Sequence, residues 1–497
     1  MSAATRPAGG GTPMSGLSAP APLPVSAPLA GAATDGSAGT MLLLSSSLLT
    51  ERMLLYTDCL PLLRERASVT LWSTSTGGDD DQAADVREPF PRISPYREYY
   101  NVLRRLNEFT WDATLRLPSR QSIVKYRRYP PVVRMMKAPA RLLAAAGLAQ
   151  PLEDRLERWL EAYPRSVEAF ERLRRTRPAF MLTTGPFQTE QTAIVTAARR
   201  LGIPIIALIP SWDNVSTKNR MVFKYDGYLV WSDWTKRELH AVYSHSRDVP
   251  VYVIGAPQFD VFFQDRFRLT RESFCRSQGL RPDRPFIVHA IGSPNFLREH
   301  HAVFDMARSV ARGDLGDLQL LVRPHPQHDN GEFDEQLRSL GPRIVVQRTA
   351  RPGMPLTART QDTDQIREWV NTFRHADVVV NLSSTVAIDA AIFDRPVVNL
   401  DYDPEPGAPN QRLVKDVNHV WTHFKPIAES GGVWLVDDAA AMIEATRTYL
   451  AHPELHREQR RAIAALVCQH LDGRCGGRMA SALIDFADHC RRSTSVR

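Results

Sequence analysis

Short runs of consecutive apolar residues, with no polar alternation, recur along most of this chain. One run, residues 378–380, is all valine; a polar turn at 381–385, a helical segment at 385–393 and a further apolar run, Val397–Leu400, follow it. Continuous β-branched runs are typical of strands that are buried on both faces of a sheet. Strand, turn, helix and strand in this order predict a parallel βαβ unit, which binds ligands at the carboxyl ends of its strands.

The same alternation predicts two groups of strands separated by helices. The first group comprises residues 41–45, 69–73, 179–183, 204–209, 227–231 and 251–255, and the second comprises residues 286–290, 318–322, 343–347, 378–380, 397–400 and 433–436. We therefore expect an α/β protein with two doubly wound parallel-sheet domains that face each other across a cleft. The expected divisions are a disordered tail (1–40), an N-terminal domain (41–256), a C-terminal domain (257–452) and a helical segment packing across both (453–497).

Composition narrows the class of protein. Of the 497 residues, 43% are hydrophobic and 24% charged, as in ordinary globular chains, and no apolar run reaches the length of a membrane span. The five cysteines are odd in number and lack CxxC spacing, which predicts a reducing compartment and no structural zinc. The net charge of +7 is spread thinly and no recognition motif is present, so nucleic-acid binding is not expected.

The turn after the valine run carries candidate binding residues. Ser383, Ser384 and Thr385 stand at the start of the helical segment, where backbone N–H groups and hydroxyls together favour an anion. Asp389 follows Thr385 by four residues, so it shares that helical face and could accept hydrogen bonds from a ribose. The alternative is that a serine merely caps the helix and Asp389 is a solvated carboxylate.

Two other strand exits carry candidate ligands for phosphate. Arg323 and His325 lie in an Arg-Pro-His-Pro motif directly after one strand, and their prolines prevent both ladder bonding and helix continuation there. A guanidinium fork and a titratable imidazole suit a diphosphate. Gly292 and Ser293, which follow the strand Phe286–Ala290, are further candidates for binding the same ligand.

Polar residues also follow two strands of the first group. Asp213 lies in the segment Ser-Trp-Asp-Asn after residues 204–209, and Glu190 follows residues 179–183. Both are candidates for a catalytic base at the ligand edge of the sheet. No metal site is expected, because the His325–His328 pair is interrupted by proline and has no carboxylate partner.

Residues 115–150 contain eight Arg or Lys residues and no Asp or Glu. Because apolar side chains are mixed with these cations, the segment could contact an anionic membrane face. The alternative is a solvated basic surface, since two consecutive prolines, Pro130 and Pro131, interrupt any long amphipathic helix.

Residues 381–398 (NLSSTVAIDAAIFDRPVV) resemble the donor-binding segment of GT-B type nucleotide-dependent enzymes. The similarity is to CDP-glycerol glycerophosphotransferases and surface-carbohydrate glycosyltransferases, and more distantly to sugar-nucleotide 2-epimerases. It extends from about residue 181 to the C-terminus and includes the Arg-Pro-His-Pro and Ser-Trp-Asp-Asn segments. The resemblance implies that Ser383 and Ser384 meet the donor phosphate and that Asp389 meets the ribose.

The resemblance implies a GT-B-like transferase for surface polysaccharide biosynthesis. It would move a sugar or a polyol phosphate from a nucleotide-activated donor in the C-terminal domain to a glycan or lipid-linked acceptor in the N-terminal domain. No cofactor or metal is expected, because cationic groups can stabilise the departing nucleotide. The expected location is cytoplasmic, at the inner face of the cell membrane. The alternatives are a sugar-nucleotide epimerase and a non-catalytic nucleotide-binding assembly subunit.

Overall fold

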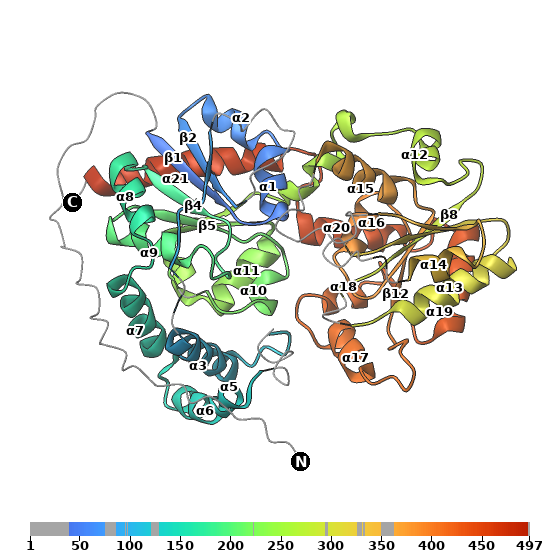
Figure 1. Cartoon of the computed structure of the whole chain (residues 1–497), viewed down its shortest axis with the longest axis horizontal. Coiled ribbons are helices and arrows are strands. Elements are labelled where there is room, and N and C mark those ends of the chain that lie inside the picture. The colour runs from blue at the N-terminus through green and yellow to red at the C-terminus, as the bar shows by residue number, and fades with distance from the viewer. Residues whose placement is uncertain are drawn as a thin grey trace, which may run out of the picture. The chain divides into compact units, whose positions relative to one another are not determined.

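The structure is a computed structural model that describes residues 39–74, 86–94, 96, 98–120, 129–221, 223–293, 297–325, 331, 333–348 and 362–495. Within these residues the chain forms two parallel sheets, one of seven strands and one of six, with helices between the strands (Figure 1). The predicted tail lies outside the described residues except for its last two positions, and Thr40 already belongs to the first strand. The α/β class with two parallel sheets is confirmed.

The first sheet has the strand order β3-β2-β1-β4-β5-β6-β7, and every pair is parallel. Its strands are β1 (Thr40–Ser45), β2 (Ser68–Ser73), β3 (Arg87–Pro89), β4 (Phe180–Thr183), β5 (Ile205–Leu208), β6 (Gly227–Val230) and β7 (Val251–Val253). The sequence pattern did not predict β3, because this short edge strand is polar and partly exposed.

The helices of this part are α1 (Leu48–Leu55), α2 (Cys59–Arg64), α3 (Glu98–Leu115), α5 (Pro131–Met135), α6 (Lys137–Ala145), α7 (Ala149–Ala162), α8 (Val167–Thr176), α9 (Thr192–Arg200), α10 (Asn214–Thr217) and α11 (Asp233–Val242). The short helices η3 (Ser244–Asp248), η4 (Pro257–Phe262) and η5 (Asp265–Phe267) follow. α3 packs on α6 and α7, and α7 packs on α9, which contacts β5, so helices connect the described part of the basic segment 115–150 to the first sheet. Residues 121–128 of that segment lie outside the described residues.

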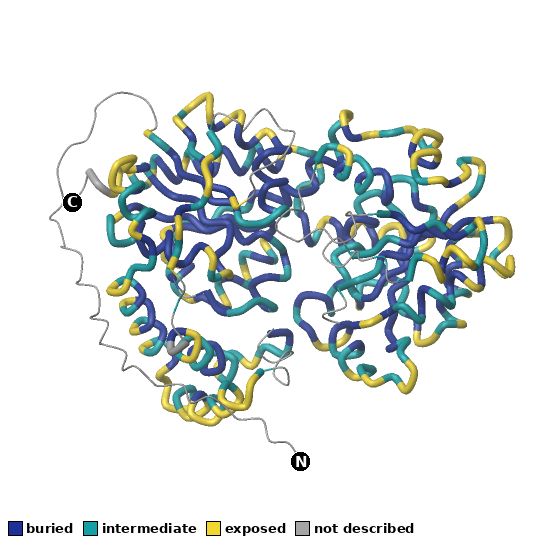
Figure 2. The backbone as a smooth tube through the Cα atoms, in the orientation of Figure 1, coloured by how far each residue is buried: buried dark blue, intermediate teal, exposed yellow. Residues whose placement is uncertain are grey.

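The second sheet has the order β10-β9-β8-β11-β12-β13 and is also parallel throughout. Its strands are β8 (Phe286–Ala290), β9 (Gln319–Arg323), β10 (Ile344–Val346), β11 (Val378–Asn381), β12 (Val397–Leu400) and β13 (Trp434–Val436). All four residues of β11 are fully buried, as the unbroken valine run predicts. Figure 2 shows the same burial along the central strands.

The helices of the second part are α12 (Arg271–Gln278), α13 (His300–Arg312), α14 (Asp334–Arg338), α15 (Thr363–His375), α16 (Val386–Ile392), α17 (Gln411–His419), α18 (Lys425–Glu429), α19 (Ala439–Ala451), α20 (Arg457–Cys468) and α21 (Cys475–Ser495). α20 packs on α16 and also contacts α11, whereas α21 packs on α2, η4 and β6. The C-terminal helices thus contact both sheet-bearing halves. The exact domain boundaries at 256/257 and 452/453 stay predictions.

The start of α21 is fixed by a carboxylate from η4. Asp260 accepts hydrogen bonds from the backbone N–H groups of Cys475 (3.1 Å) and Gly476 (2.6 Å). Glycine is required at 476, because a Cβ there would clash with the side chain of Thr57. Two segments that are more than two hundred residues apart in the sequence therefore meet and hold the terminal helix in place.

No helix in the described part of the chain has the length and apolar character needed to cross a membrane.

Candidate functional site

Most of the predicted binding residues line one cavity of about 210 Å³. It receives residues from the loop after β5 and from the ends of β8, β9 and β11. The lining residues are Trp212, Asp213, Gly292, Ser293, Leu297, Glu299, His325, Leu382, Ser383, Ser384, Thr385, His423 and Phe424. Because the carboxyl ends of parallel strands meet at one edge of a sheet, the positions after β8, β9 and β11 converge here. This cavity is called the donor-side cavity below.

The serine turn between β11 and α16 has an unusual backbone. Ser383 has a φ of 46°, in the left-handed region that is costly for a residue with a Cβ. The side chain of Asn399 accepts a hydrogen bond from the Ser383 N–H (2.7 Å), and the side chain of Asn381 accepts one from the Ser384 N–H (3.0 Å). These two N–H groups are therefore already used, and the other polar groups of the turn at the cavity are the hydroxyl residues Ser384 and Thr385, which line it.

A buried amide network holds this turn from behind. Asn418 Oδ1 accepts from the Ser383 hydroxyl (2.7 Å) and from Asn399 Nδ2 (3.1 Å), and Asn418 Nδ2 donates to Asp401 (2.9 Å). Asn381, Asn399 and Asn418 are all fully buried. Asn399 and Asn418 hydrogen-bond to each other and to Ser383, so this side of the turn is held in a single geometry.

Asp213 enters the donor-side cavity from the first half of the chain. Its Oδ1 accepts from the Ser211 hydroxyl (2.6 Å) and from Asn214 Nδ2 (3.0 Å), and its Oδ2 accepts from the Thr217 hydroxyl (3.1 Å). Burial opposes ionisation, but the charge of Lys218, the nearby His423 and these hydroxyls outweigh it and lower the pKa of Asp213. Asp213 is therefore a carboxylate at neutral pH.

His423 is a cavity residue that the sequence reasoning missed. It lies between α17 and α18, is 7% exposed, and its ring is 5.4 Å from that of Trp212 and 5.6 Å from that of Trp421. Burial lowers the pKa of His423 to about 4, against the opposing charge of Asp213. The sequence analysis looked for candidates directly after strands, whereas His423 follows a helix. Its one signal in the sequence is the aromatic run around it, Val-Trp-Thr-His-Phe.

Glu238 on α11 is a second missed group close to Asp213. Burial raises its pKa to about 7; a hydrogen bond from Ser216 opposes the shift and the charge of Asp213 adds to it. A carboxyl that titrates near neutral pH is a candidate for proton transfer. It does not belong to the lining of the donor-side cavity.

Asp389 lies outside the lining of this cavity and contacts protein groups. It is 5% exposed, and Trp369 Nε1 donates to its Oδ1 at 2.9 Å. The guanidinium of Arg52 lies 4.0 Å from the Trp369 ring, so a cation is close by. Burial raises the pKa of Asp389 to about 7, although Arg52, Trp369 and Arg323 act in the opposite direction. Its contact with a ribose stays a prediction.

The two candidate phosphate ligands of the Arg-Pro-His-Pro motif, Arg323 and His325, differ in their position relative to the cavity. His325 lines the donor-side cavity, whereas Arg323 does not. Arg323 donates to the side chain of Gln347 and stacks at 5.9 Å from the Phe373 ring. The phosphate roles of Arg323 and His325 stay predictions.

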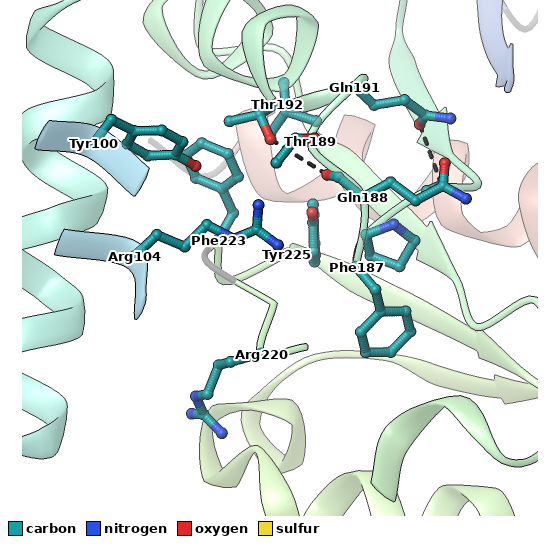
Figure 3. A pocket seen from close by; sticks show the side chains of 13 residues that line it. Tyr100, Arg104, Phe187, Gln188, Thr189, Gln191, Thr192, Arg220, Phe223 and Tyr225 are labelled. Atoms are coloured by element: carbon teal, nitrogen blue, oxygen red, sulfur yellow. Dashed lines mark hydrogen bonds between the residues drawn. The ribbon is translucent and has the colours of Figure 1, made fainter. Parts of the chain in front are cut away.

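A second cavity of about 290 Å³ lies at the ends of β4 and β5. Its lining residues are Arg104, Thr184, Gly185, Phe187, Gln188, Thr189, Glu190, Pro210, Asn214, Lys218 and Asn219. Figure 3 shows a smaller adjoining pocket with the same Arg104 and Gln188, where Tyr100 and Arg104 reach from α3 toward Thr189, Thr192 and Tyr225. We call the larger one the first-sheet cavity. Glu190 is exposed on its wall.

Asp213 and Glu190 are thus not in the same cavity. The loop of residues 210–219 contributes Trp212 and Asp213 to the donor-side cavity and Asn214 and Lys218 to the first-sheet cavity. No cluster of three or more metal-ligating side chains occurs in the described part of the chain.

Comparison with known proteins adds information about the fold. No protein-family model matches the sequence, and no curated protein matches it. Among solved structures, the chain resembles a Staphylococcus aureus MnaA–UDP complex (12% identity, TM-score 0.50) and a putative UDP-N-acetylglucosamine 2-epimerase from Listeria monocytogenes (14%, 0.51). Each match covers 90% of this chain and 97% of the other. Acinetobacter baumannii MurG matches at 11% identity over 91% of this chain and 99% of its own, with a TM-score of 0.43.

These likenesses establish a GT-B-like fold over nine-tenths of the chain. At such low identity they show the fold alone.

Proposed function

We propose that this protein is a GT-B-like transferase that moves a sugar, or a polyol phosphate, from a nucleotide-activated donor to a separate acceptor. The donor nucleotide occupies the donor-side cavity, with its phosphates between His325 and the hydroxyls of Ser384 and Thr385. Hydroxyls and an imidazole from three chain positions can donate to one diphosphate. The rigid serine turn supports this placement, because fixed donors stabilise developing charge without reorganising.

The observation that carries the transferase proposal is the pair of cavities on either side of the loop 210–219. An isomerase needs room for one substrate, whereas a transferase must hold a donor and an acceptor at once. The first-sheet cavity is lined by Arg104 and Lys218, so it suits an acceptor that carries a phosphate or another anionic group. On this proposal Asp213 acts on the donor side of the loop and Lys218 on the acceptor side.

The surface of α5 and α6 suggests that this acceptor is linked to a lipid. Val132 (61% exposed), Met135 (75%) and Leu142 (73%) lie on it, together with the exposed cations Arg134 and Arg141. Exposed apolar side chains beside cations bind anionic bilayers. α6 packs on α3, and α3 supplies Arg104 to the first-sheet cavity. A bilayer that contacts this surface would bring lipid-linked acceptors close to that cavity, on the cytoplasmic side of the membrane.

The test of the transferase proposal is donor turnover with and without acceptor. The purified protein is incubated with UDP-, GDP- and CDP-activated sugars and with CDP-glycerol, alone and together with short-chain polyprenyl-phosphate-linked sugars, and nucleotide release is measured. The proposal predicts release that depends on the acceptor. Turnover of a donor alone into an isomer, or turnover of none of these donors, would contradict it.

The second candidate is a sugar-nucleotide 2-epimerase. It is supported by the likeness to the Listeria monocytogenes structure, which is described as a putative UDP-N-acetylglucosamine 2-epimerase. An epimerase would use the donor-side cavity alone and would interconvert two nucleotide sugars in the absence of any acceptor. The incubation with donor alone separates the two candidates.

A further inference from the structure

Three buried polar atoms on residues that line the donor-side cavity have no hydrogen-bond partner among the described residues: Trp212 Nε1, Glu299 Oε2 and His423 Nδ1. Glu299 Oε2 lies 3.9 Å from His289 Nε2. The side chains of Trp212, Glu299 and His423 are 3%, 1% and 7% exposed, respectively. An unpaired buried polar atom is costly, and native proteins leave few of them. Their concentration on residues of one cavity supports a polar ligand at this site.

We propose that His423 is the proton acceptor of the transfer reaction. This inference rests on the proposed transferase function and adds a catalytic residue to it. The ring lies at the cavity wall beside the serine turn where the donor phosphates bind, and beside the loop that separates the donor from the acceptor. Its contacts with the Trp212 and Trp421 rings restrict the direction of the imidazole.

The charge state of His423 fits this role. An imidazole must be neutral before it can accept a proton. In the protein without a bound donor, burial keeps the pKa of His423 well below neutral pH. Asp213 is the charged group that faces it, while His325 and Glu299 are the other titratable groups on the cavity wall. The negative charges of a bound diphosphate raise the pKa of His423 toward neutral pH, where an imidazole is most effective as a base.

The step balances as follows. The acceptor hydroxyl loses its proton to an imidazole nitrogen of His423, and its oxygen forms the new bond to the anomeric carbon of the donor sugar. The bond between that carbon and the phosphate oxygen breaks, and its electron pair leaves with the nucleoside diphosphate. For a polyol phosphate donor, the new bond is to phosphorus and the electron pair leaves with the nucleoside monophosphate. The Asp213 carboxylate stabilises the imidazolium until the proton passes to water.

The test compares His423→Asn and His423→Ala with the wild type and with His452→Asn, a control at an exposed histidine whose side chain is 62% exposed. For each protein the melting temperature, the UDP affinity and the acceptor-dependent kcat are measured. The proposal predicts that kcat of His423→Asn falls about 10²–10⁴-fold, the usual contribution of general base catalysis, while its UDP affinity stays within about threefold. Exogenous imidazole should restore part of the rate of His423→Ala, and the control should behave as wild type.

The pH profile gives an independent readout. Wild-type kcat should fall on the acid side as His423 becomes protonated, and this limb should be absent in His423→Asn. Asp213→Asn should move the limb to lower pH, because the carboxylate raises the pKa of His423.

A His423→Asn protein that keeps kcat within about threefold of wild type would overturn the assignment and leave the transferase function standing. A loss of rate without imidazole rescue, and with the acid limb unchanged, would also overturn it, because those results describe a structural role. A wild-type protein that turns over no donor would overturn the proposed function and the role of His423 together.

Discussion

The buried carboxylate of Asp389 makes the stability of the folded protein depend on pH. Its pKa is raised to about 7 by burial, whereas an unfolded aspartate titrates near 4. Between these two values the folded protein binds more protons than the unfolded chain, so stability falls as pH rises through this window. The Asp389 contribution is therefore fully favourable below about pH 4 and lost above about pH 7.

The substitution Asp389→Asn removes this titration and keeps an oxygen that accepts from Trp369. Wild-type unfolding free energy should fall relative to that of the variant between pH 5 and pH 8, by about 1–3 kcal/mol. Urea unfolding of both proteins at the two pH values measures the difference. Parallel pH dependences would show that Asp389 is ionised throughout. If a ribose also contacts this carboxylate, the variant binds UDP more weakly as well.

At the scale of elements, the serine turn depends on residues from other elements. Ser383 adopts a left-handed backbone, and Asn399 on β12 and Asn418 on α17 supply the acceptors that keep it there. The serine turn at the donor-side cavity is thus positioned by a strand and a helix that contribute no residue to the lining of that cavity.

Replacing Asn399 with alanine should therefore weaken both stability and binding. The Ser383 N–H loses its acceptor inside the protein, which costs about 1–3 kcal/mol of unfolding free energy. UDP affinity of the folded variant should also fall, because the turn is no longer fixed. Urea unfolding and calorimetric titration measure the two effects. Asn410→Ala is the control, since that side chain makes no capping hydrogen bond at the start of α17; equal behaviour of the two variants would contradict the role of the network.

The surface of α5 and α6 makes a separate prediction. Wild-type protein should sediment with vesicles that contain phosphatidylglycerol but not with pure phosphatidylcholine vesicles, and added salt should weaken the binding. The double variant Met135→Glu/Leu142→Glu should lose at least tenfold in vesicle affinity. It replaces the two most exposed apolar side chains of this surface with carboxylates, which the negatively charged lipid repels.

Val167→Glu is the matched control for this experiment, because Val167 is 68% exposed but lies on α8, away from the basic segment. Vesicle binding that is unchanged in the double variant, or equal reduction in the control, would remove the membrane from the proposed function.

Across the whole molecule, local patterns predicted the framework well. Continuous apolar runs identify strands because a parallel sheet is buried on both faces, and β11 and β12 lie where their valines indicate. The same logic located Gly292, Ser293, His325 and the serine turn, since each follows a strand of one sheet and the ends of those strands meet.

What local patterns could not supply is the orientation of side chains and the contacts between distant segments. Arg323 and His325 are two residues apart, yet only His325 lines the cavity. The Arg323 guanidinium instead donates a hydrogen bond to Gln347, the residue after the neighbouring strand β10. Asn399 and Asn418 read as ordinary polar positions until the fold brings both to Ser383. His423 could not be identified from the sequence for the same reason. The residues that affect it, Asp213 through its charge and Trp212 through a ring contact, lie more than two hundred residues earlier in the chain.

The central claim is that the donor-side cavity binds the diphosphate of a nucleotide, and calorimetric titration with UDP, GDP and CDP tests it most directly. At least one of them should bind the wild-type protein. His325→Ala should then weaken that affinity by about 1.5–3 kcal/mol, the range for a hydrogen bond to a charged group, or roughly 10–150-fold. His452→Ala should bind as wild type does. Absence of binding by all three nucleotides at millimolar concentration, or an unchanged affinity in folded His325→Ala, would contradict the claim.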